Sequence, residues 1–341
     1  RTSTRRLCAP APAFASSLAG HGLRHIEPLT LDDIRAARER IASTVARTPL
    51  IRLNVDAPAE IYLKLETLQP IGSFKLRGAS NAVAMLSSES LRDGVYTASA
   101  GNMAQGVAWS ARALGVPCTV IMPNSAPQTK TQAVARLGAD IEYVPYDEWW
   151  QTLADHGRKG ISGTFVHPVA DRTVMAGNGT IGLEIVEDLP DVAAVLVPFG
   201  GGGLVSGIST ALRALAPKAQ VFGCEVSTST PLTAALAADA PVMVERTPSF
   251  VDGIGGRGVL AEMWPIVRHA VDGALVAPLD EVARTVRLLV ERARVVAEGA
   301  GATSVACALG DHRIRGKIVC VVSGGNIDLE TLLELLSSSR A

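Results

Sequence analysis

The stretch Val195-Leu196-Val197-Pro198-Phe199-Gly200-Gly201-Gly202-Gly203-Leu204 joins an apolar run to four glycines and to a second apolar segment that continues to Leu215. The first run predicts a buried strand, and the spacing after the glycines predicts a helix. Backbone N–H groups of glycines can surround an anion, and a helix N-terminus adds a favourable dipole. We therefore interpret Gly200, Gly201, Gly202, Gly203 and Leu204 as a phosphate site, with tight helix–sheet packing as the alternative.

Strand-like and helix-like segments alternate along most of the chain. Short apolar runs predict strands at 61–65, 95–97, 118–122, 141–144, 194–197, 221–225 and 318–322. Helical patterns separate most of these strands. Strands that alternate with helices form mostly parallel sheets covered on both faces. The predicted fold class is therefore α/β, with Pro241–Arg257, rich in Pro and Gly, as a long connecting loop.

The composition narrows the class of protein. The chain has 341 residues, of which 48% are hydrophobic, and 32 Lys and Arg balance 33 Asp and Glu. This balance, with aromatic residues at only 4%, argues against nucleic-acid and membrane-surface partners. No apolar run reaches the roughly 20 residues of a membrane helix. We expect a soluble enzyme or binding protein for a small molecule.

Two features bear on location in the cell. The five cysteines are scattered and odd in number, which is typical of a reducing compartment such as the cytoplasm. Residues 1–26 carry several Arg, Ser and Ala and no acidic residue, a composition that resembles a transit peptide. Organellar targeting is thus an alternative to the cytoplasm, and a disordered extension is the other interpretation of this segment.

Three more segments carry polar groups after predicted strands or at a helix start: Phe74-Lys75, Ser99-Ala100-Gly101-Asn102 and Ser323-Gly324-Gly325-Asn326. Ligands bind at the carboxyl edge of open α/β sheets, so we expect these segments to converge. A partly desolvated lysine has a lowered pKa and a reactive amine. Backbone N–H groups at Ser99–Asn102 can hold a carboxylate, and Asn102 and Ser323 can hydrogen-bond a ring. Together with the glycines, these groups indicate pyridoxal phosphate (PLP).

Five segments in this order resemble the threonine/serine dehydratase (ammonia-lyase) branch of the fold-type II PLP enzymes: Gly72–Ala79, Ser99–Ala108, Gly200–Leu204, Glu298–Ala302 and Ser323–Asn326. The resemblance implies a two-lobed, three-layer α/β/α fold with mostly parallel sheets. It implies a large PLP-binding domain of residues 28–92 and 171–335, a small domain of residues 93–170, and a flexible extension of residues 1–27. A homodimer is the expected assembly.

The resemblance also implies how the cofactor is held. Lys75 would form the internal aldimine, and Phe74 would pack on the cofactor ring. Asn102 would contact the 3′ oxygen, and Ser323 would face the pyridine nitrogen. The phosphate would be bound by Gly200, Gly201, Gly202, Gly203 and Leu204.

The substrate carboxylate would be bound, by the same resemblance, at Ser99, Gly101, Asn102 and Met103. The implied reaction is an elimination through an aminoacrylate, in which the amine of Lys75 removes the Cα proton. It converts a β-hydroxy amino acid of the threonine/serine type into a 2-keto acid and ammonia. A β-replacement enzyme, an amino-acid racemase and a non-catalytic binding protein on the same fold are the alternatives.

Two positions depart from the pattern of this branch. Met103 stands where the branch usually has His, which makes the carboxylate pocket more apolar unless this residue contributes only its backbone. Ala100 stands where racemases of the family carry a serine that exchanges a proton, so racemisation is disfavoured.

No metal site is predicted. Glu225 occupies the place of a cation ligand found in some relatives, but the second carboxylate of that motif is missing. The six histidines show no metal-binding spacing. The chain also ends soon after the last motif, so we expect no C-terminal regulatory domain.

Overall fold

The computed structural model describes residues 24–126, 128–310 and 313–337. The predicted extension 1–27 lies almost wholly outside these residues. None of the helices in the described ranges is long and apolar enough to cross a membrane.

The larger of the two sheets has six strands in the order β1-β2-β10-β7-β8-β9. Neighbouring strands within this sheet are parallel, except that β1 pairs antiparallel with β2. The central strands β7 and β10 are buried along almost their whole length, as expected for strands covered on both faces. The strands are β1 (Leu50–Arg52), β2 (Glu60–Leu65), β7 (Ala194–Pro198), β8 (Gln220–Val226), β9 (Gly273–Ala277) and β10 (Lys317–Val322).

The smaller sheet has four parallel strands in the order β5-β4-β3-β6. They are β3 (Val95–Ala98), β4 (Cys118–Pro123), β5 (Asp140–Val144) and β6 (Thr164–Phe165). All four come from the predicted small domain, and all strands of the larger sheet come from the two segments of the predicted large domain. The α/β fold with mostly parallel sheets is confirmed, while the domain boundaries themselves stay a prediction.

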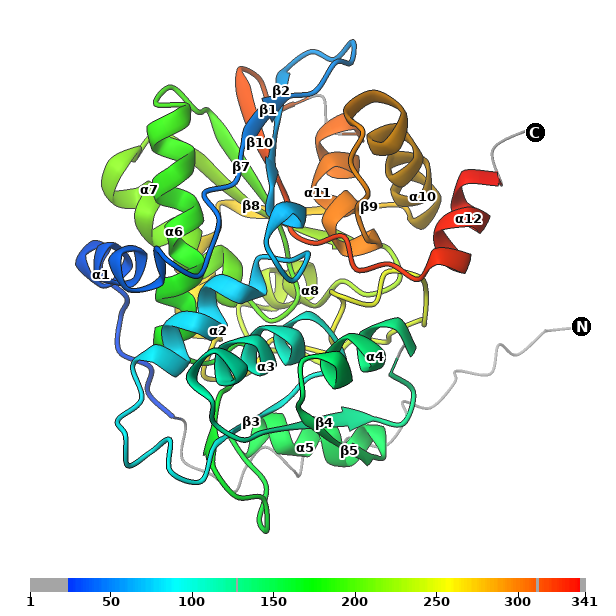
Figure 1. The fold of residues 1–341 in the computed structure, drawn as a ribbon. Coiled ribbons are helices and arrows are strands. Elements are labelled where there is room, and N and C mark those ends of the chain that lie inside the picture. The colour runs from blue at the N-terminus through cyan, green and yellow to red at the C-terminus, as the bar shows by residue number, and fades with distance from the viewer. Residues whose placement is uncertain (1–23, 127, 311–312, 338–341) are drawn as a thin grey trace, which may run out of the picture.

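Helices cover both faces of the larger sheet. Figure 1 shows α6 and α7 on one side of it and α10 and α11 on the other, with α2, α3 and α4 beside the smaller sheet. The helices are α1 (Leu31–Ile41), α2 (Lys75–Ala84), α3 (Asn102–Leu114), α4 (Gln128–Arg136), α5 (Tyr146–Ala154), α6 (Arg172–Asp188), α7 (Gly203–Leu215), α8 (Pro231–Ala238), α9 (Trp264–Ala270), α10 (Leu279–Leu288), α11 (Gly299–Gly310) and α12 (Leu329–Ser337).

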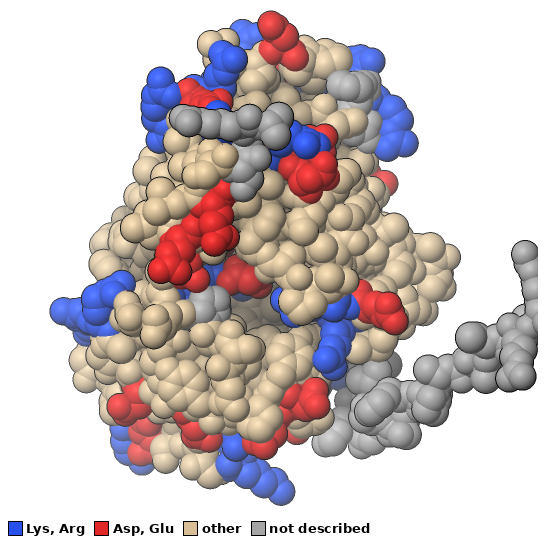
Figure 2. Space-filling model, turned by 90° about the vertical axis from the view of Figure 1, so that its right-hand side faces the viewer, with Lys and Arg blue, Asp and Glu red and all other residues tan. Residues whose placement is uncertain are grey.

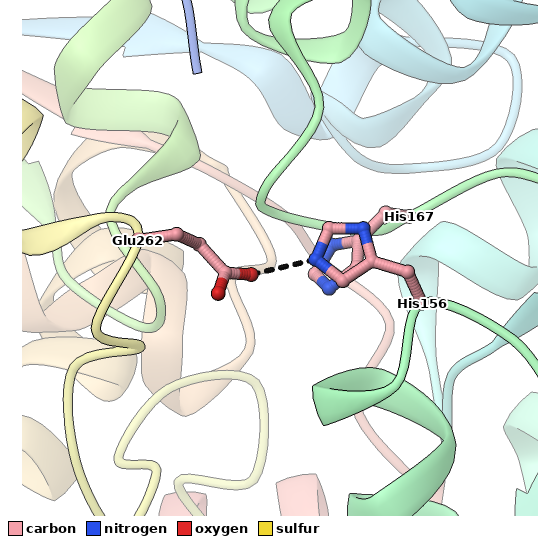
Figure 3. Close-up of side chains that lie close together, drawn as sticks. All are labelled: His156, His167 and Glu262. Carbon is pink, nitrogen blue, oxygen red and sulfur yellow. Dashed lines mark hydrogen bonds and ion pairs between the residues drawn. The ribbon is translucent and has the colours of Figure 1, made fainter. Parts of the chain in front are cut away.

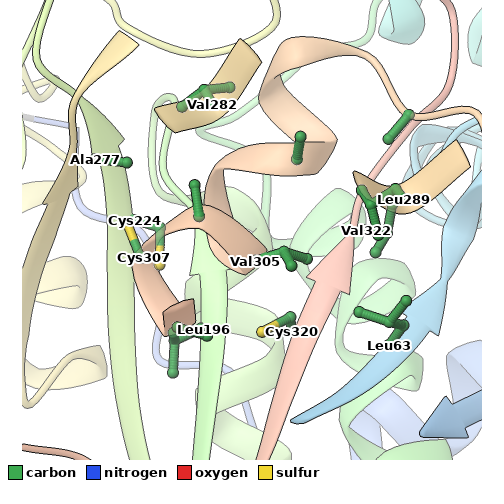
Figure 4. Close-up of a cluster of buried hydrophobic side chains, with 14 of the residues drawn as sticks. Leu63, Leu196, Cys224, Ala277, Val282, Leu289, Val305, Cys307, Cys320 and Val322 are labelled. Carbon is green, nitrogen blue, oxygen red and sulfur yellow. The ribbon is translucent and has the colours of Figure 1, made fainter. Parts of the chain in front are cut away.

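Each face of the larger sheet has its own apolar core. On one face, β2, β7, β8 and β10 pack against α10 and α11 (Figure 4). Cys224, Cys307 and Cys320 are free and buried in this core, where they act as small apolar side chains. On the other face, α6 and α7 bury their apolar sides against β7 and β10.

The face of the molecule drawn in Figure 2 carries its charges in small separate groups. Lys and Arg side chains stand close to Asp and Glu side chains, with uncharged surface between the groups. This pattern agrees with the balanced composition of the chain.

A buried ionic network fixes α2 against the larger sheet. The guanidinium of Arg77, 0% exposed, donates from Nε and Nη2 to the two oxygens of Glu66, both at 2.8 Å. Arg77 also donates to both oxygens of Glu184 on α6, at 2.7 and 2.9 Å. Lys64 on β2 completes the group with a 2.5 Å bond to Glu184 and a 2.6 Å bond to the carbonyl of Thr48.

The charges of this network balance, because two cations face two carboxylates. Burial alone would raise the pKa of Glu66, but the charge and hydrogen bonds of Arg77 outweigh it and hold that pKa below its usual range. Removing one partner would leave an uncompensated buried charge.

We expect Arg77→Met to destabilise the protein strongly. The loss of one partner of a buried pair costs about 3–5 kcal/mol, because the carboxylates of Glu66 and Glu184 remain buried. The unfolding midpoint in urea, followed by circular dichroism, measures the effect. Arg284→Met is the matched control, since Arg284 pairs with Asp280 and Glu281 on the exposed face of α10 and its removal should leave the midpoint unchanged. Equal midpoints for the two variants would contradict the role of the network.

Candidate active site

The four predicted segments open onto one cavity of about 610 Å³. They follow β2, β3, β7 and β10, so they meet at the carboxyl edges of the two sheets. Every candidate residue lines this cavity: Phe74, Lys75, Ser99, Gly101, Asn102, Met103, Gly200, Gly201, Gly202, Gly203, Leu204 and Ser323.

Lys75 is the first residue of α2, and its amine lies at the cavity wall. Its Nζ donates a 2.8 Å hydrogen bond to the carbonyl of Pro168 and lies 5.2 Å from the centre of the Phe74 ring. Burial lowers the pKa of Lys75 to about 8, because no carboxylate among the described residues compensates for the lost water. At pH 7 roughly a tenth of such an amine is neutral, far more than for an ordinary lysine, and this neutral fraction is nucleophilic and basic.

The backbone of this lysine is tied to the loop after β10. The N–H of Phe74 donates to the carbonyl of Ser323 at 3.0 Å, and Ser73 forms an isolated bridge with Gly324. Asn326 donates to the carbonyl of Ile71 at 2.8 Å. Segments about 250 residues apart in the chain are therefore held in one arrangement around the cavity.

Asn102 is held by two protein partners. Its Nδ2 donates to Glu298 at 2.7 Å, and its Oδ1 accepts from Asn326 at 2.8 Å. An amide NH₂ has two hydrogens, so one remains for a ligand in the cavity. Burial raises the pKa of Glu298, against the opposing effect of Lys130.

A second lysine in the cavity was not found by sequence reasoning. Lys130 on α4 donates to both oxygens of Asp252 at 2.8 and 2.7 Å and lies 3.5 Å from Glu298. Burial opposes its charge, but Glu298 and Asp252 outweigh burial and raise the pKa of Lys130. Its sequence context, Gln128-Thr129-Lys130-Thr131, is that of an exposed helix start, and only the fold reveals its partners.

The glycine loop packs tightly against its neighbours, as the alternative interpretation of this stretch expected. A Cβ on Gly201 would come within 2.7 Å of Val169, and Gly202 has a φ of +98° and lies against Val267. Gly203 would come within 3.0 Å of the carbonyl of Val169, whereas a Cβ on Gly200 would make only ordinary contacts. Tight packing therefore requires three of the four glycines, and they bring the N-terminus of α7, which no side chain caps, to the cavity.

The loop after β3 brings a second helix N-terminus to the cavity. Gly101 precedes α3 without a side-chain cap, and its N–H donates to the hydroxyl of Ser99 at 3.2 Å. The side chain of Met103 is 1% exposed and packs in the core of the smaller sheet, which favours the interpretation that this position contributes its backbone.

Two histidines and a glutamate lie together beside the cavity, although their spacing gave no sign of it (Figure 3). His156 pairs with Glu262 at 2.6 Å, and its ring lies 4.4 Å from that of His167. Nδ1 of His167 accepts two backbone N–H bonds and Nε2 lies 3.2 Å from the carbonyl of Leu153. Both ring nitrogens of His167 are thus engaged by the protein, which leaves no free lone pair for a metal.

Glu225 has a structural role in the described fold. It accepts from the backbone of Leu232 at 2.6 Å and from the backbone and hydroxyl of Thr233 at 2.9 and 2.6 Å. The carboxylate therefore caps the N-terminus of α8, where its charge also favours the helix dipole.

The cavity fits pyridoxal phosphate. Its volume lies within the usual range of roughly 300–1,000 Å³ for ligand sites. The buried amine of Lys75 and the uncapped N-terminus of α7 both lie at this cavity, an arrangement that suits a molecule carrying an aldehyde and a phosphate.

Comparison with known proteins gives the same result. Residues 41–324 match the family described as "Pyridoxal-phosphate dependent enzyme". The chain is 41% identical over 315 residues to the L-threonine ammonia-lyase of Thermotoga maritima, covering 91% of this chain and 78% of that protein. It is 37% identical over 313 residues to the "L-threonine dehydratase catabolic TdcB" of Staphylococcus aureus (strain N315), covering 88% and 90%.

Two solved structures illustrate the shared fold. Maize serine racemase aligns with a TM-score of 0.84 and 30% identity, covering 92% of this chain and 98% of that one. The processed form of threonine deaminase isoform 2 from Solanum lycopersicum aligns with a TM-score of 0.78 and 29% identity, covering 94% and 98%. The predicted fold type, cofactor and family resemblance are confirmed: this chain belongs to the family of pyridoxal-phosphate dependent enzymes.

Proposed function

We propose that this chain is a PLP-dependent ammonia-lyase that converts a β-hydroxy amino acid of the threonine/serine type into a 2-keto acid and ammonia. The observation that carries the proposal is the amine of Lys75, with its lowered pKa, in one cavity with two uncapped helix N-termini. The relatives named L-threonine ammonia-lyase and dehydratase support the substrate class. Water lost in the elimination returns in the final hydrolysis, so the net products are the keto acid and ammonia.

Lys75 moves the proton in this reaction. When bound, the cofactor supplies an electron sink for the carbanion that forms as the substrate loses its Cα proton. Lys75 supplies the base, because about half of its amine is neutral at pH values near its pKa of about 8. The carbonyl of Pro168 orients this amine at the cavity wall, 2.8 Å from Nζ.

The two helix N-termini orient the substrate and the cofactor. The N–H groups at the start of α3, with Ser99, Gly101, Asn102 and the backbone of Met103, are placed to bind the substrate carboxylate. The start of α7, from Gly200 to Leu204, is placed to bind the phosphate. A carboxylate and a phosphate held at two points leave the reacting carbon little freedom, which favours reaction over release.

Phe74 and Ser323 are proposed to meet the cofactor ring. Phe74 precedes Lys75, and its N–H donates to the carbonyl of Ser323 in the loop after β10. Phe74 and Ser323 both line the cavity. A serine hydroxyl can hydrogen-bond a ring nitrogen but, unlike a carboxylate, does not stabilise a full positive charge there. This weaker electron sink favours prompt loss of the β-hydroxyl.

The racemase alternative is disfavoured by one position. Maize serine racemase shares the fold, so the fold does not separate the two activities. Racemisation needs a second proton donor across the cavity from the lysine. Ala100 lines the cavity next to Gly101 and has no proton to donate, which supports elimination.

The organisation of the protein is part of the same proposal. We infer a large domain of residues 28–92 and 171–335 and a small domain of residues 93–170, supported by the two separate sheets. A homodimer in the cytoplasm is supported by the prevalence of two-fold assemblies and by four buried free cysteines.

Lys75→Ala tests the proposal directly. The purified variant should lose the yellow absorbance of the lysine-bound cofactor, and keto-acid formation from L-threonine or L-serine should fall by about 10³-fold or more, as for removal of a general base. Lys218→Ala, at an exposed lysine, is the matched control and should behave as wild type. Wild-type protein that holds PLP but releases no keto acid from either substrate would contradict the proposed reaction.

The lowered pKa of Lys75 predicts a distinct pH dependence in the apoprotein. A protonated amine does not react, so acylation of Lys75 by a small neutral reagent should rise with a midpoint near pH 8. An ordinary lysine has a pKa of about 10.4. Mass spectrometry of the digest gives the extent of labelling at each pH, with exposed Lys218 as the internal reference. Identical pH profiles for the two lysines would show that the cavity does not desolvate Lys75.

A further inference from the structure

One short turn, His167–Ala170, connects a buried imidazole to both halves of the cofactor cavity. His167 follows β6 and is 2% exposed. Its Nδ1 accepts hydrogen bonds from the backbone N–H groups of Val169 at 3.0 Å and Ala170 at 2.7 Å. Pro168 has no N–H, so these are the two donors that the turn offers.

The hydrogen bonds determine the tautomer of this ring. Two donors at Nδ1 require a lone pair there, so the proton lies on Nε2 and is donated to the carbonyl of Leu153 at 3.2 Å. Burial, with the neighbouring His156, lowers the pKa of His167 to about 3. The ring is therefore a neutral acceptor for the turn throughout the physiological pH range.

The turn presents two groups to the cavity. The carbonyl of Pro168 accepts the 2.8 Å hydrogen bond from Nζ of Lys75. Val169 forms the surface against which the glycine loop packs, within 2.7 Å of a Cβ on Gly201 and 3.0 Å of one on Gly203. A shift of this turn would therefore move the lysine amine and the phosphate loop together.

Two neighbouring aromatic rings also support the imidazole. The ring of His156 lies 4.4 Å from it, and Phe165 meets it edge-on with the centroids 5.8 Å apart. His156 is fixed in turn by its 2.6 Å bond to Glu262 (Figure 3). His167 is thus held at both ring nitrogens and contacts two neighbouring aromatic rings.

We propose that His167 is a positioning residue that sets the amine of Lys75 and the glycine loop through the backbone of the His167–Ala170 turn. The inference rests on the proposed role of Lys75. His167 itself does not touch the reacting atoms. It acts through the lone pair of Nδ1, which accepts the hydrogen bonds from Val169 and Ala170.

Two substitutions of similar size separate this role from simple packing. The side-chain oxygen of Asn reaches nearly the position of Nδ1, so His167→Asn retains an acceptor for Val169 and Ala170. The amide of Gln lies one bond further out, near Nε2, so His167→Gln retains only the bond to Leu153. His167→Leu removes both.

Cofactor affinity and the acylation profile of Lys75 are the readouts, each measured on the full chain. For His167→Leu and His167→Gln, the Kd for PLP should rise about tenfold or more, as expected for the loss of two hydrogen bonds. The labelling midpoint of Lys75 should move upward from pH 8 toward the ordinary lysine value as water enters. His167→Asn should stay within about threefold of the wild-type Kd, well inside that tenfold change.

The proposal would be overturned if His167→Asn and His167→Gln had the same Kd for PLP and the same labelling midpoint of Lys75. It would also be overturned if all three variants kept the wild-type Kd and midpoint. The Asn–Gln comparison decides the matter even where His167→Leu fails to fold. Lys75→Ala keeps the two hypotheses apart: unchanged cofactor spectra in that variant would contradict the proposed function. Loss of the spectrum there, together with wild-type behaviour of the His167 variants, would contradict only the role of His167.

Discussion

The forked ion pair between Arg77 and Glu66, shared with Glu184, is the interaction on which the site depends. Arg77 lies two residues after Lys75 on α2, so any rotation or shift of this helix would move the amine. Because the guanidinium binds one carboxylate beside β2 and another on α6, α2 is fixed relative to both. The low dielectric of the interior makes misalignment costly, because a buried charge that loses its partners has no water to replace them.

The same cavity contains two lysines whose surroundings act in opposite directions. Within the part of the chain that the structure describes, no carboxylate offsets the burial of Lys75, and burial lowers the pKa of its amine to about 8. Lys130 lies between Asp252 and Glu298, which raise its pKa and keep its charge. Our proposal that Lys75 is the nucleophile and base rests on this difference. Lys130 links α4 electrostatically to the 241–257 loop through Asp252.

Much of the fold could be predicted from the sequence because its signals are local. The apolar strands, the glycines and the helices that follow them are encoded within a few residues, as in Ala194–Leu215. Convergence of the candidate residues followed from the rule that ligands bind at the carboxyl edge of strands. For the glycines, the structure shows close packing against Val169 and Val267, which the sequence offered only as the alternative interpretation.

The missed features depend on contacts between distant parts of the chain. Lys130 and Asp252 are 122 residues apart, and Arg77 and Glu184 are 107 apart. No local pattern marks such pairs, and a lysine or arginine on a helix is usually solvated. The same holds for His167, whose role is visible only when its turn is placed between Lys75 and the glycine loop.

Borohydride reduction of the PLP-loaded protein, followed by peptide mapping, identifies the lysine that carries the cofactor, because reduction attaches the cofactor to it permanently. We expect the modified peptide to contain Lys75, and we expect Lys130, which also lines the cavity, to remain unmodified. Modification at Lys130, or no modified lysine in a protein that retains PLP, would contradict it.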